Sequence, residues 1–150
     1  MTNLSKLKQI KISETEFPAN SEDVVTNITA KLRKVQIREL DDSTEVYLNL
    51  EATDGRQFVD VTRFKGDEDR LASTIKYFSA HTKNIFNQLG DKYDKYLNSI
   101  EDVLELLNKA EKEKAQFLMS TVDSGYKDPK NPSKVFLDVL YGDEKQRGQA

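Results

Sequence analysis

The sequence predicts a mainly β domain with a helical insertion, in the order β-β-β-α-α-β-β. Three patterns lead to this prediction: alternating β-branched and polar residues up to residue 64, two helical stretches between residues 67 and 113, and two strand-like runs after residue 115. A doubly wound α/β sheet does not fit, because three strands precede any helix. At 150 residues the chain is long enough for one domain with a real core.

The chain divides into three regions. Residues 1–22 are polar with isolated apolar positions, which predicts a flexible N-terminal arm. Residues 23–142 form the predicted domain, with a helical hairpin at 67–113. Residues 143–150, DEKQRGQA, form a polar tail.

Residues 23–38 alternate as a strand does, with Ile28, Ala30 and Leu32 on one face. The phase changes near Lys34, after which Val35 and Ile37 are the apolar positions. A phase change inside a long strand predicts a β-bulge, which lets a strand bend around a small barrel.

The stretch EVYLNLEATDGRQFVDVTRF, residues 45–64, predicts a hairpin with a two-residue Asp54-Gly55 turn. Pairing outward from this turn sets Leu50 opposite Val59. One face then belongs to the core: Val46, Leu48, Leu50, Ala52, Val59 and Val61. The other face carries three aromatic rings and three carboxylates: Tyr47, Phe58, Phe64, Glu45, Glu51 and Asp60. Phe64, the last ring in its strand, is expected in the core.

Two helices are predicted next. The first begins at Gly66-Asp67, carries an apolar residue every three or four positions and ends at Gly90. Asp91 is expected to cap a second helix that ends in EKEK, residues 111–114. Such a short connection predicts an antiparallel helical hairpin.

Residues 115–123 and 135–142 read as the last two strands, joined by the loop SGYKDPKNPS. Five strands with a helical insertion between the third and fourth form the order of the OB-fold, a small Greek-key barrel. We therefore predict a five-stranded OB-fold barrel.

Enzyme signatures are few. The chain has no cysteine and one histidine, His81, which falls in the middle of a predicted helix and lacks a metal-ligand partner at helical spacing. The six glycines form no phosphate-binding loop. No apolar run approaches the roughly 20 residues of a membrane span. We expect a non-enzymatic cytoplasmic protein without a metal or cofactor.

The exposed strand faces combine aromatic and basic residues. In an OB barrel, bases stack on the face of strands 2 and 3, and basic loops flank the groove. Tyr47 and Phe58 are the candidate stacking residues. The candidate cations are Lys31, Arg33, Arg56, Arg63, Lys65, Lys127, Lys130 and Lys134, of which Arg63 is expected on the core side. The alternative is that the outer rings pack beneath the helical pair or the N-terminal arm as ordinary core residues.

The N-terminal arm carries four apolar side chains that the domain need not use: Leu4, Leu7, Ile10 and Ile12. One interpretation is disorder. The other is an arm that docks on a neighbouring subunit, which would produce cooperative coating of a single strand.

The three-strand meander at 23–64 and the hairpin at 115–141 resemble OB-fold single-stranded DNA-binding proteins, in particular those encoded with conjugative-plasmid transfer genes in Gram-positive bacteria. The resemblance covers about residues 23–141 and implies sequence-tolerant DNA binding beside a transfer machinery, with self-association through the arm. Housekeeping bacterial members differ from this chain, since they have an acidic tail ending in Pro-Phe, one helix and a tryptophan platform.

The sequence thus predicts single-stranded DNA as the partner, with double-stranded DNA tolerated if backbone contacts dominate. A net charge of −3 and the carboxylates near the supposed platform leave a second hypothesis open. In that hypothesis the chain is a protein-interaction adaptor that uses the helical hairpin and the arm and binds no nucleic acid.

Overall fold

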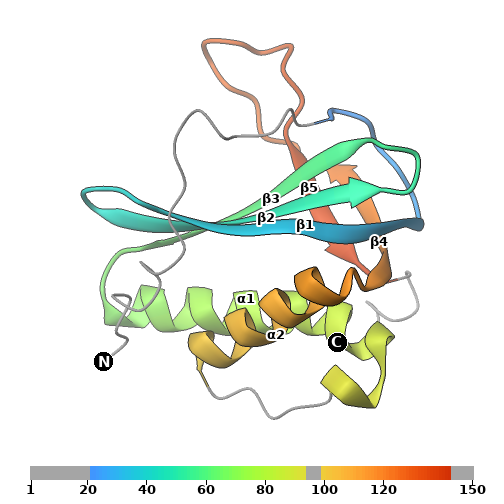
Figure 1. Ribbon diagram of the computed structural model, residues 1–150. Coiled ribbons are helices and arrows are strands. Elements are labelled where there is room, and N and C mark those ends of the chain that lie inside the picture. The colour runs from blue at the N-terminus through green and yellow to red at the C-terminus, as the bar shows by residue number, and fades with distance from the viewer. Residues whose placement is uncertain (1–20, 94–98, 143–150) are drawn as a thin grey trace.

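The computed structural model describes residues 21–93 and 99–142 as a five-stranded antiparallel sheet with its helices on one side (Figure 1). The strands are β1 (Ile28–Glu39), β2 (Ser43–Ala52), β3 (Gln57–Lys65), β4 (Gln116–Asp123) and β5 (Leu137–Tyr141). The helices are α1 (Glu68–Leu89), the short 3₁₀ helix η3 (Asp91–Tyr93) and α2 (Ile100–Glu113). The predicted mainly β architecture with a helical insertion is confirmed. The N-terminal arm, apart from its last two residues, and the polar tail lie outside the described residues.

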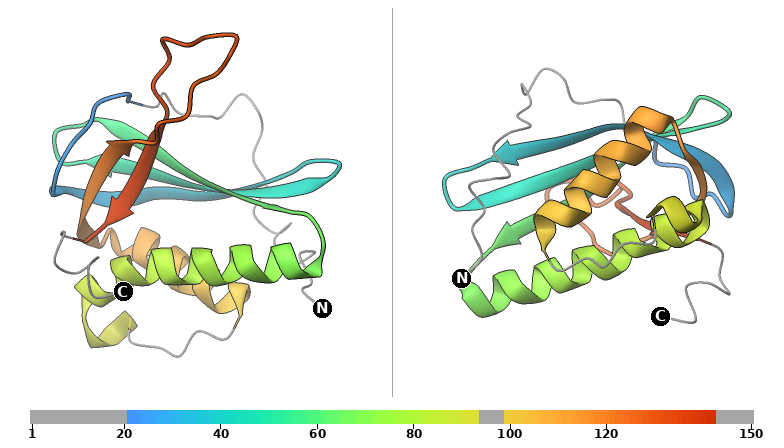
Figure 2. Two further views of the ribbon diagram at one scale, coloured as in Figure 1. Left: turned by 180° about the vertical axis from the view of Figure 1, so that it is seen from behind. Right: turned by 60° about the horizontal axis from the view of Figure 1, so that its bottom comes forward.

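The strand order in the sheet is β3-β2-β1-β4-β5, so β1 lies at the centre and pairs with both β2 and β4. The β4–β5 hairpin crosses the other strands steeply, which coils the sheet (Figures 1 and 2). Its two edges, β3 and β5, form no ladder with each other in the part of the chain described, and the sheet stays open. They approach at one point, where the Tyr141 hydroxyl donates to Asp60 Oδ2 at 2.6 Å.

The predicted bulge in the first strand is confirmed. The pairing of β1 with β2 shifts between Leu32 and Lys34, so one extra residue enters β1 there. Leu32 before the shift and Val35 after it are therefore both buried on the core face. The strand begins at Ile28, later than the predicted residue 23.

The predicted register of the β2–β3 hairpin is wrong by one residue. The Ala52 N–H donates to the Arg56 carbonyl at 2.8 Å, which leaves three residues in the turn instead of two. Gly55 takes the last of these positions with a φ of +93°, the conformation that such turns require of their third residue. Leu50 consequently pairs with Phe58 rather than with Val59.

This shift exchanges the two faces of β3 relative to the predicted pairing. The separate prediction that Phe64 lies in the core is confirmed. Phe58 and Phe64 are buried in the core at 1% exposure, whereas Val61, predicted in the core, is 45% exposed. The β2 side of the core is as predicted, with Leu48 and Leu50 buried.

The first helix begins as predicted. Asp67 is its N-cap and accepts a hydrogen bond from the Arg70 backbone N–H at 3.0 Å, and Gly90 ends it with a φ of +88°. The predicted start of the second helix is wrong, because Ser99 caps α2 and Asp91 instead opens η3.

The core lies between the sheet and the two long helices. Helix α1 packs against β3, β4 and β5, and α2 packs against β1 (Figure 2). Phe78 of α1 meets Phe64 edge to face at 5.7 Å between ring centroids, and Leu107 of α2 is fully buried. The helices thus cover the core face of the sheet and leave the β4–β5 loop, residues 124–136, projecting on the opposite side (Figure 1).

Candidate nucleic-acid interface

The outer face of β1 and β2 is not an open stacking surface. Around Tyr47 it carries buried polar side chains: Gln36, Glu45 and Asn49 are exposed by 1%, 5% and 2%. Asn49 Nδ2 donates to Gln36 Oε1 at 2.5 Å. Tyr47 itself is half-buried, and its hydroxyl donates to Glu45 Oε1 at 2.8 Å. Burial, followed by this hydrogen bond, raises the pKa of Tyr47.

Phe58 is excluded as a platform by its burial. The predicted pair of exposed rings, Tyr47 and Phe58, therefore reduces to one half-buried ring held by a carboxylate. The alternative interpretation, in which an outer ring is an ordinary core residue, is correct for Phe58.

The strand cations lie beside carboxylates. Arg63 Nη2 lies 2.8 Å from Glu45 Oε2, and Lys65 Nζ lies 3.1 Å from Asp42 Oδ2. Arg63, expected on the core side, has a side chain 58% exposed. Because these ion pairs offset the positive charge, both cations are weak candidates for phosphate contacts.

Arg56 and Lys31 are paired as well. The Arg56 guanidinium contacts Asp23 at 3.1 Å and Asp54 at 2.7 Å, and these hydrogen bonds raise its pKa. Lys31 Nζ lies 3.8 Å from Glu51. Arg33 is exposed at the β1 bulge.

The β4–β5 loop differs, because its three lysines form no ion pair with any residue in the described ranges. Lys127, Lys130 and Lys134 are all exposed. Lys134 Nζ lies 5.0 Å from the centroid of the Phe136 ring, a cation–π geometry. Tyr126 packs edge to face on the same ring at 5.2 Å and remains 57% exposed. An exposed ring and cations without an ion pair in the described part of the chain therefore lie in one segment.

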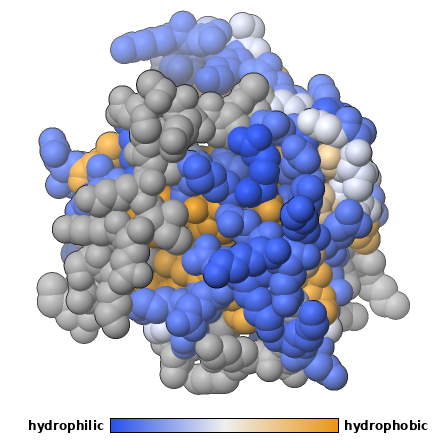
Figure 3. Space-filling view, in the orientation of Figure 1, coloured by the Kyte–Doolittle hydropathy of each residue, from blue (hydrophilic) through white to orange (hydrophobic). Residues whose placement is uncertain are grey.

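Short-range hydrogen bonds shape this loop. The Ser124 N–H donates to the Phe136 carbonyl at 2.8 Å and closes the loop at its base. Asp123 Oδ1 accepts from the Gly125 N–H at 2.8 Å, and Asp128 Oδ1 accepts from the Lys130 N–H at 2.9 Å. In these Asx-turns an aspartate side chain binds the backbone two residues further on, and they fix the backbone conformation around Tyr126 and the lysines. In Figure 3 the upper end of the molecule, where the loop projects, is largely hydrophilic.

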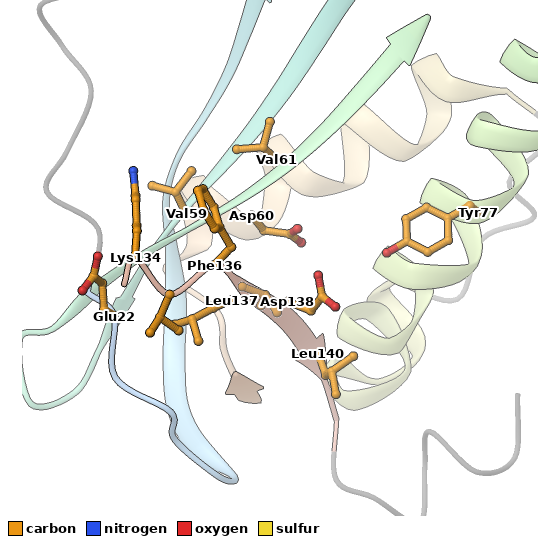
Figure 4. A pocket seen from close by; sticks show the side chains of 12 residues that line it. Glu22, Val59, Asp60, Val61, Tyr77, Lys134, Phe136, Leu137, Asp138 and Leu140 are labelled. Atoms are coloured by element: carbon orange, nitrogen blue, oxygen red, sulfur yellow. The ribbon is translucent and has the colours of Figure 1, made fainter. Parts of the chain in front are cut away.

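A cavity of about 640 Å³ adjoins the loop, between β3 and the segment that leads into β5. Its apolar walls include Val59, Val61 and Phe136, and Lys134 lies at its border (Figure 4). Asp60 and Asp138 contribute carboxylates, and Tyr77 of α1 contributes a ring that is 59% exposed. The loop and the cavity therefore form one continuous surface.

His81 has a structural partner. Its Nε2 lies 2.8 Å from Asp60 Oδ2, the oxygen that also accepts the Tyr141 hydroxyl, and its ring stacks on Tyr77 at 5.4 Å. These contacts join α1, β3 and β5 at one carboxylate. Among residues 21–93 and 99–142, no group of histidine, cysteine and carboxylate side chains could hold a metal ion.

Sequence reasoning identified the loop lysines but missed the cavity. Its residues come from four separate segments of the chain, and Phe136, predicted within a strand, lies one residue before β5 begins. The proposed arm contacts, Leu4, Leu7, Ile10 and Ile12, lie outside the described residues.

No protein-family model matches the chain, and no curated protein matches it. In the described part of the chain, no helix is long and apolar enough to cross a membrane. The fold therefore defines the class: a mainly β protein with an open five-stranded antiparallel sheet and two helices on its core face.

Proposed function

We propose that this chain is a non-enzymatic OB-fold protein that binds single-stranded DNA without strong sequence preference, through the β4–β5 loop and the adjoining cavity. The sheet order supports the fold, since an OB barrel is a partly open five-stranded Greek key that binds oligonucleotides with its strand 4–5 loop. The observation that carries the function is the exposed Tyr126 ring in the same loop as three exposed lysines that form no ion pair with residues 21–93 or 99–142.

Each component has a defined role. Tyr126 offers a face on which a base stacks, and such stacking contributes roughly 1–3 kcal/mol for each base without readout of its identity. Lys127, Lys130 and Lys134 contact phosphates and release counterions. Arg33 and the strand cations that are paired with acids add weaker contacts to phosphates further along the bound strand. Double-stranded DNA would contact the same lysines through its backbone, without the stacking.

Fluorescence anisotropy of a labelled oligo-dT of about 30 nucleotides, titrated at about 50 and 200 mM salt, tests the proposal. The triple variant Lys127→Gln/Lys130→Gln/Lys134→Gln should bind more weakly, with the slope of log affinity against log salt reduced by about 2, near 0.7 for each phosphate contact. Tyr126→Ala should weaken binding by about tenfold with little change in that slope.

A matched control removes the same charge from the helical side of the molecule. Lys83→Gln/Lys112→Gln/Lys114→Gln replaces three exposed lysines outside the loop and should bind almost as the native protein does. If both triple variants lose affinity equally, binding depends on overall charge and the loop is not the site.

Self-association belongs to the same proposal. Arms carrying Leu4, Leu7, Ile10 and Ile12 would link neighbouring subunits along the strand and make coating cooperative. The setting that the resemblance implies is DNA transfer by a conjugative plasmid.

The adaptor remains the second candidate, and the exposed Tyr77 on α1 favours it. Tyr93, by contrast, is buried against Phe86 and offers nothing to a partner. Absence of DNA binding at low salt would leave the adaptor as the better account.

A further inference from the structure

The cavity between β3 and β5 carries negative charge in its wall, which is unfavourable for a phosphate backbone. Asp60 and Asp138 place two carboxylates in its wall (Figure 4), and phosphates are repelled by carboxylates. A third carboxylate, Glu22, also lines the cavity, against a single cation, Lys134, and the rest of the wall is mainly apolar. The volume of about 640 Å³ lies within the range of small-molecule pockets. The surface that joins it to the lysine loop therefore suits a base better than a phosphate.

The polar groups in the wall have hydrogen-bonding capacity left over. Asp60 Oδ2 is used by His81 and Tyr141, whereas its Oδ1 accepts no hydrogen bond from the described residues. The Asp138 side chain is exposed and forms no ion pair or hydrogen bond within the same ranges. Because ionised carboxylates can only accept, a ligand that approaches either oxygen must offer a donor.

Tyr77 supplies the complementary donor. Figure 4 shows its hydroxyl pointing toward the two carboxylates. Burial and then the charges of Asp60 and Asp138 raise the pKa of Tyr77, so the phenol keeps its proton at neutral pH. A donor and acceptors thus line one wall, beside the apolar side chains of Val61 and Phe136.

We propose that this cavity accepts one unstacked base and favours cytosine or adenine over thymine. Both favoured bases present an amino donor beside a ring-nitrogen acceptor, which match the exposed Asp138 carboxylate and the Tyr77 hydroxyl. Thymine presents a carbonyl oxygen in place of the amino group, and a carboxylate repels it. This inference rests on the proposed function and adds a modest base preference at one position of the bound strand.

The test compares labelled oligo-dC and oligo-dT of equal length, about 30 nucleotides, by anisotropy at about 50 mM salt. The native protein should bind oligo-dC about fivefold more tightly, the ratio expected from roughly one added hydrogen bond to a charged acceptor. Asp138→Asn should reduce this ratio to about one, because the Asn side chain can offer thymine a donor.

Asp91→Asn is the matched control. Asp91 is exposed and outside the cavity, so this variant removes one negative charge and should keep the preference for oligo-dC. Equal binding of both oligonucleotides by the native protein would overturn the base preference and leave the proposed function standing. A preference that survives in Asp138→Asn would also overturn it. Failure of both oligonucleotides to bind would overturn the proposed function itself.

Discussion

At the scale of single residues, the Asp60 carboxylate joins three elements of the fold. One of its oxygens receives Tyr141 from β5 and contacts His81 from α1 at 2.8 Å, and its own side chain is only 12% exposed. Both contacts fall on one oxygen of a carboxylate that is largely removed from water, and they stabilise it there. The two open edges of the sheet are therefore joined by side chains where no backbone ladder joins them.

Tyr141→Phe should lower the free energy of unfolding by about 1–2 kcal/mol, because it removes a partly buried hydrogen bond to a charged acceptor. Urea denaturation measures this. Tyr126→Phe is the matched control, since the Tyr126 ring is 57% exposed, and it should change stability by less than about 0.5 kcal/mol. Equal stability of the two variants would show that the contact with Asp60 contributes nothing.

Tyr93 makes the free energy of unfolding depend on pH in the alkaline range. Burial, and then its hydrogen bond to Glu113, raise the pKa of Tyr93 from 10.0 to about 12. The unfolded chain thus loses this phenol proton first, and the stabilisation present below pH 10 is lost as pH rises toward 12. Urea denaturation of the native protein and of Tyr93→Phe across this window should show a steeper loss for the native protein. Parallel curves would contradict the coupling.

At the scale of elements, the β2–β3 turn determines which face of β3 enters the core. One additional turn residue places Phe58 inside and Val61 outside. A two-residue turn would have produced the reverse, since adjacent strand residues point to opposite faces.

Phe58→Ala should therefore cost about 3–5 kcal/mol of stability, as for other buried aromatic residues. Val61→Ala, at a position 45% exposed on the same strand, should cost much less. Thermal denaturation compares the two variants. Near-native stability of Phe58→Ala would contradict the observed register and restore the ring to the outer face.

At the scale of the whole molecule, charge is distributed unevenly although the net charge is only −3. The strand cations are offset by nearby acids, such as Glu45 beside Arg63, while the loop lysines are unpaired among the described residues. Local rather than net charge governs where a polyanion would bind.

Assembly belongs to the same scale. Deleting residues 1–12 should abolish higher oligomers and reduce cooperative binding to long oligo-dT, because the deletion removes all four proposed arm contacts. Sedimentation velocity measures the oligomers, and the stability of the shortened chain serves as its control. Unchanged oligomers would rule out the arm as the link.

The sequence alone determined the order of the elements, the bulge near Lys34, the start of α1 at Asp67 and the basic loop. All of these follow from local periodicity and from capping or turn residues. The tertiary structure decided the rest: the face of Phe58, the pairing of Arg63 with Glu45, and the cavity, which Glu22 and the end of the β4–β5 loop line together with β3, α1 and β5. Each of these depends on contacts between residues far apart in the chain, and a single extra turn residue is enough to exchange the two faces of a strand.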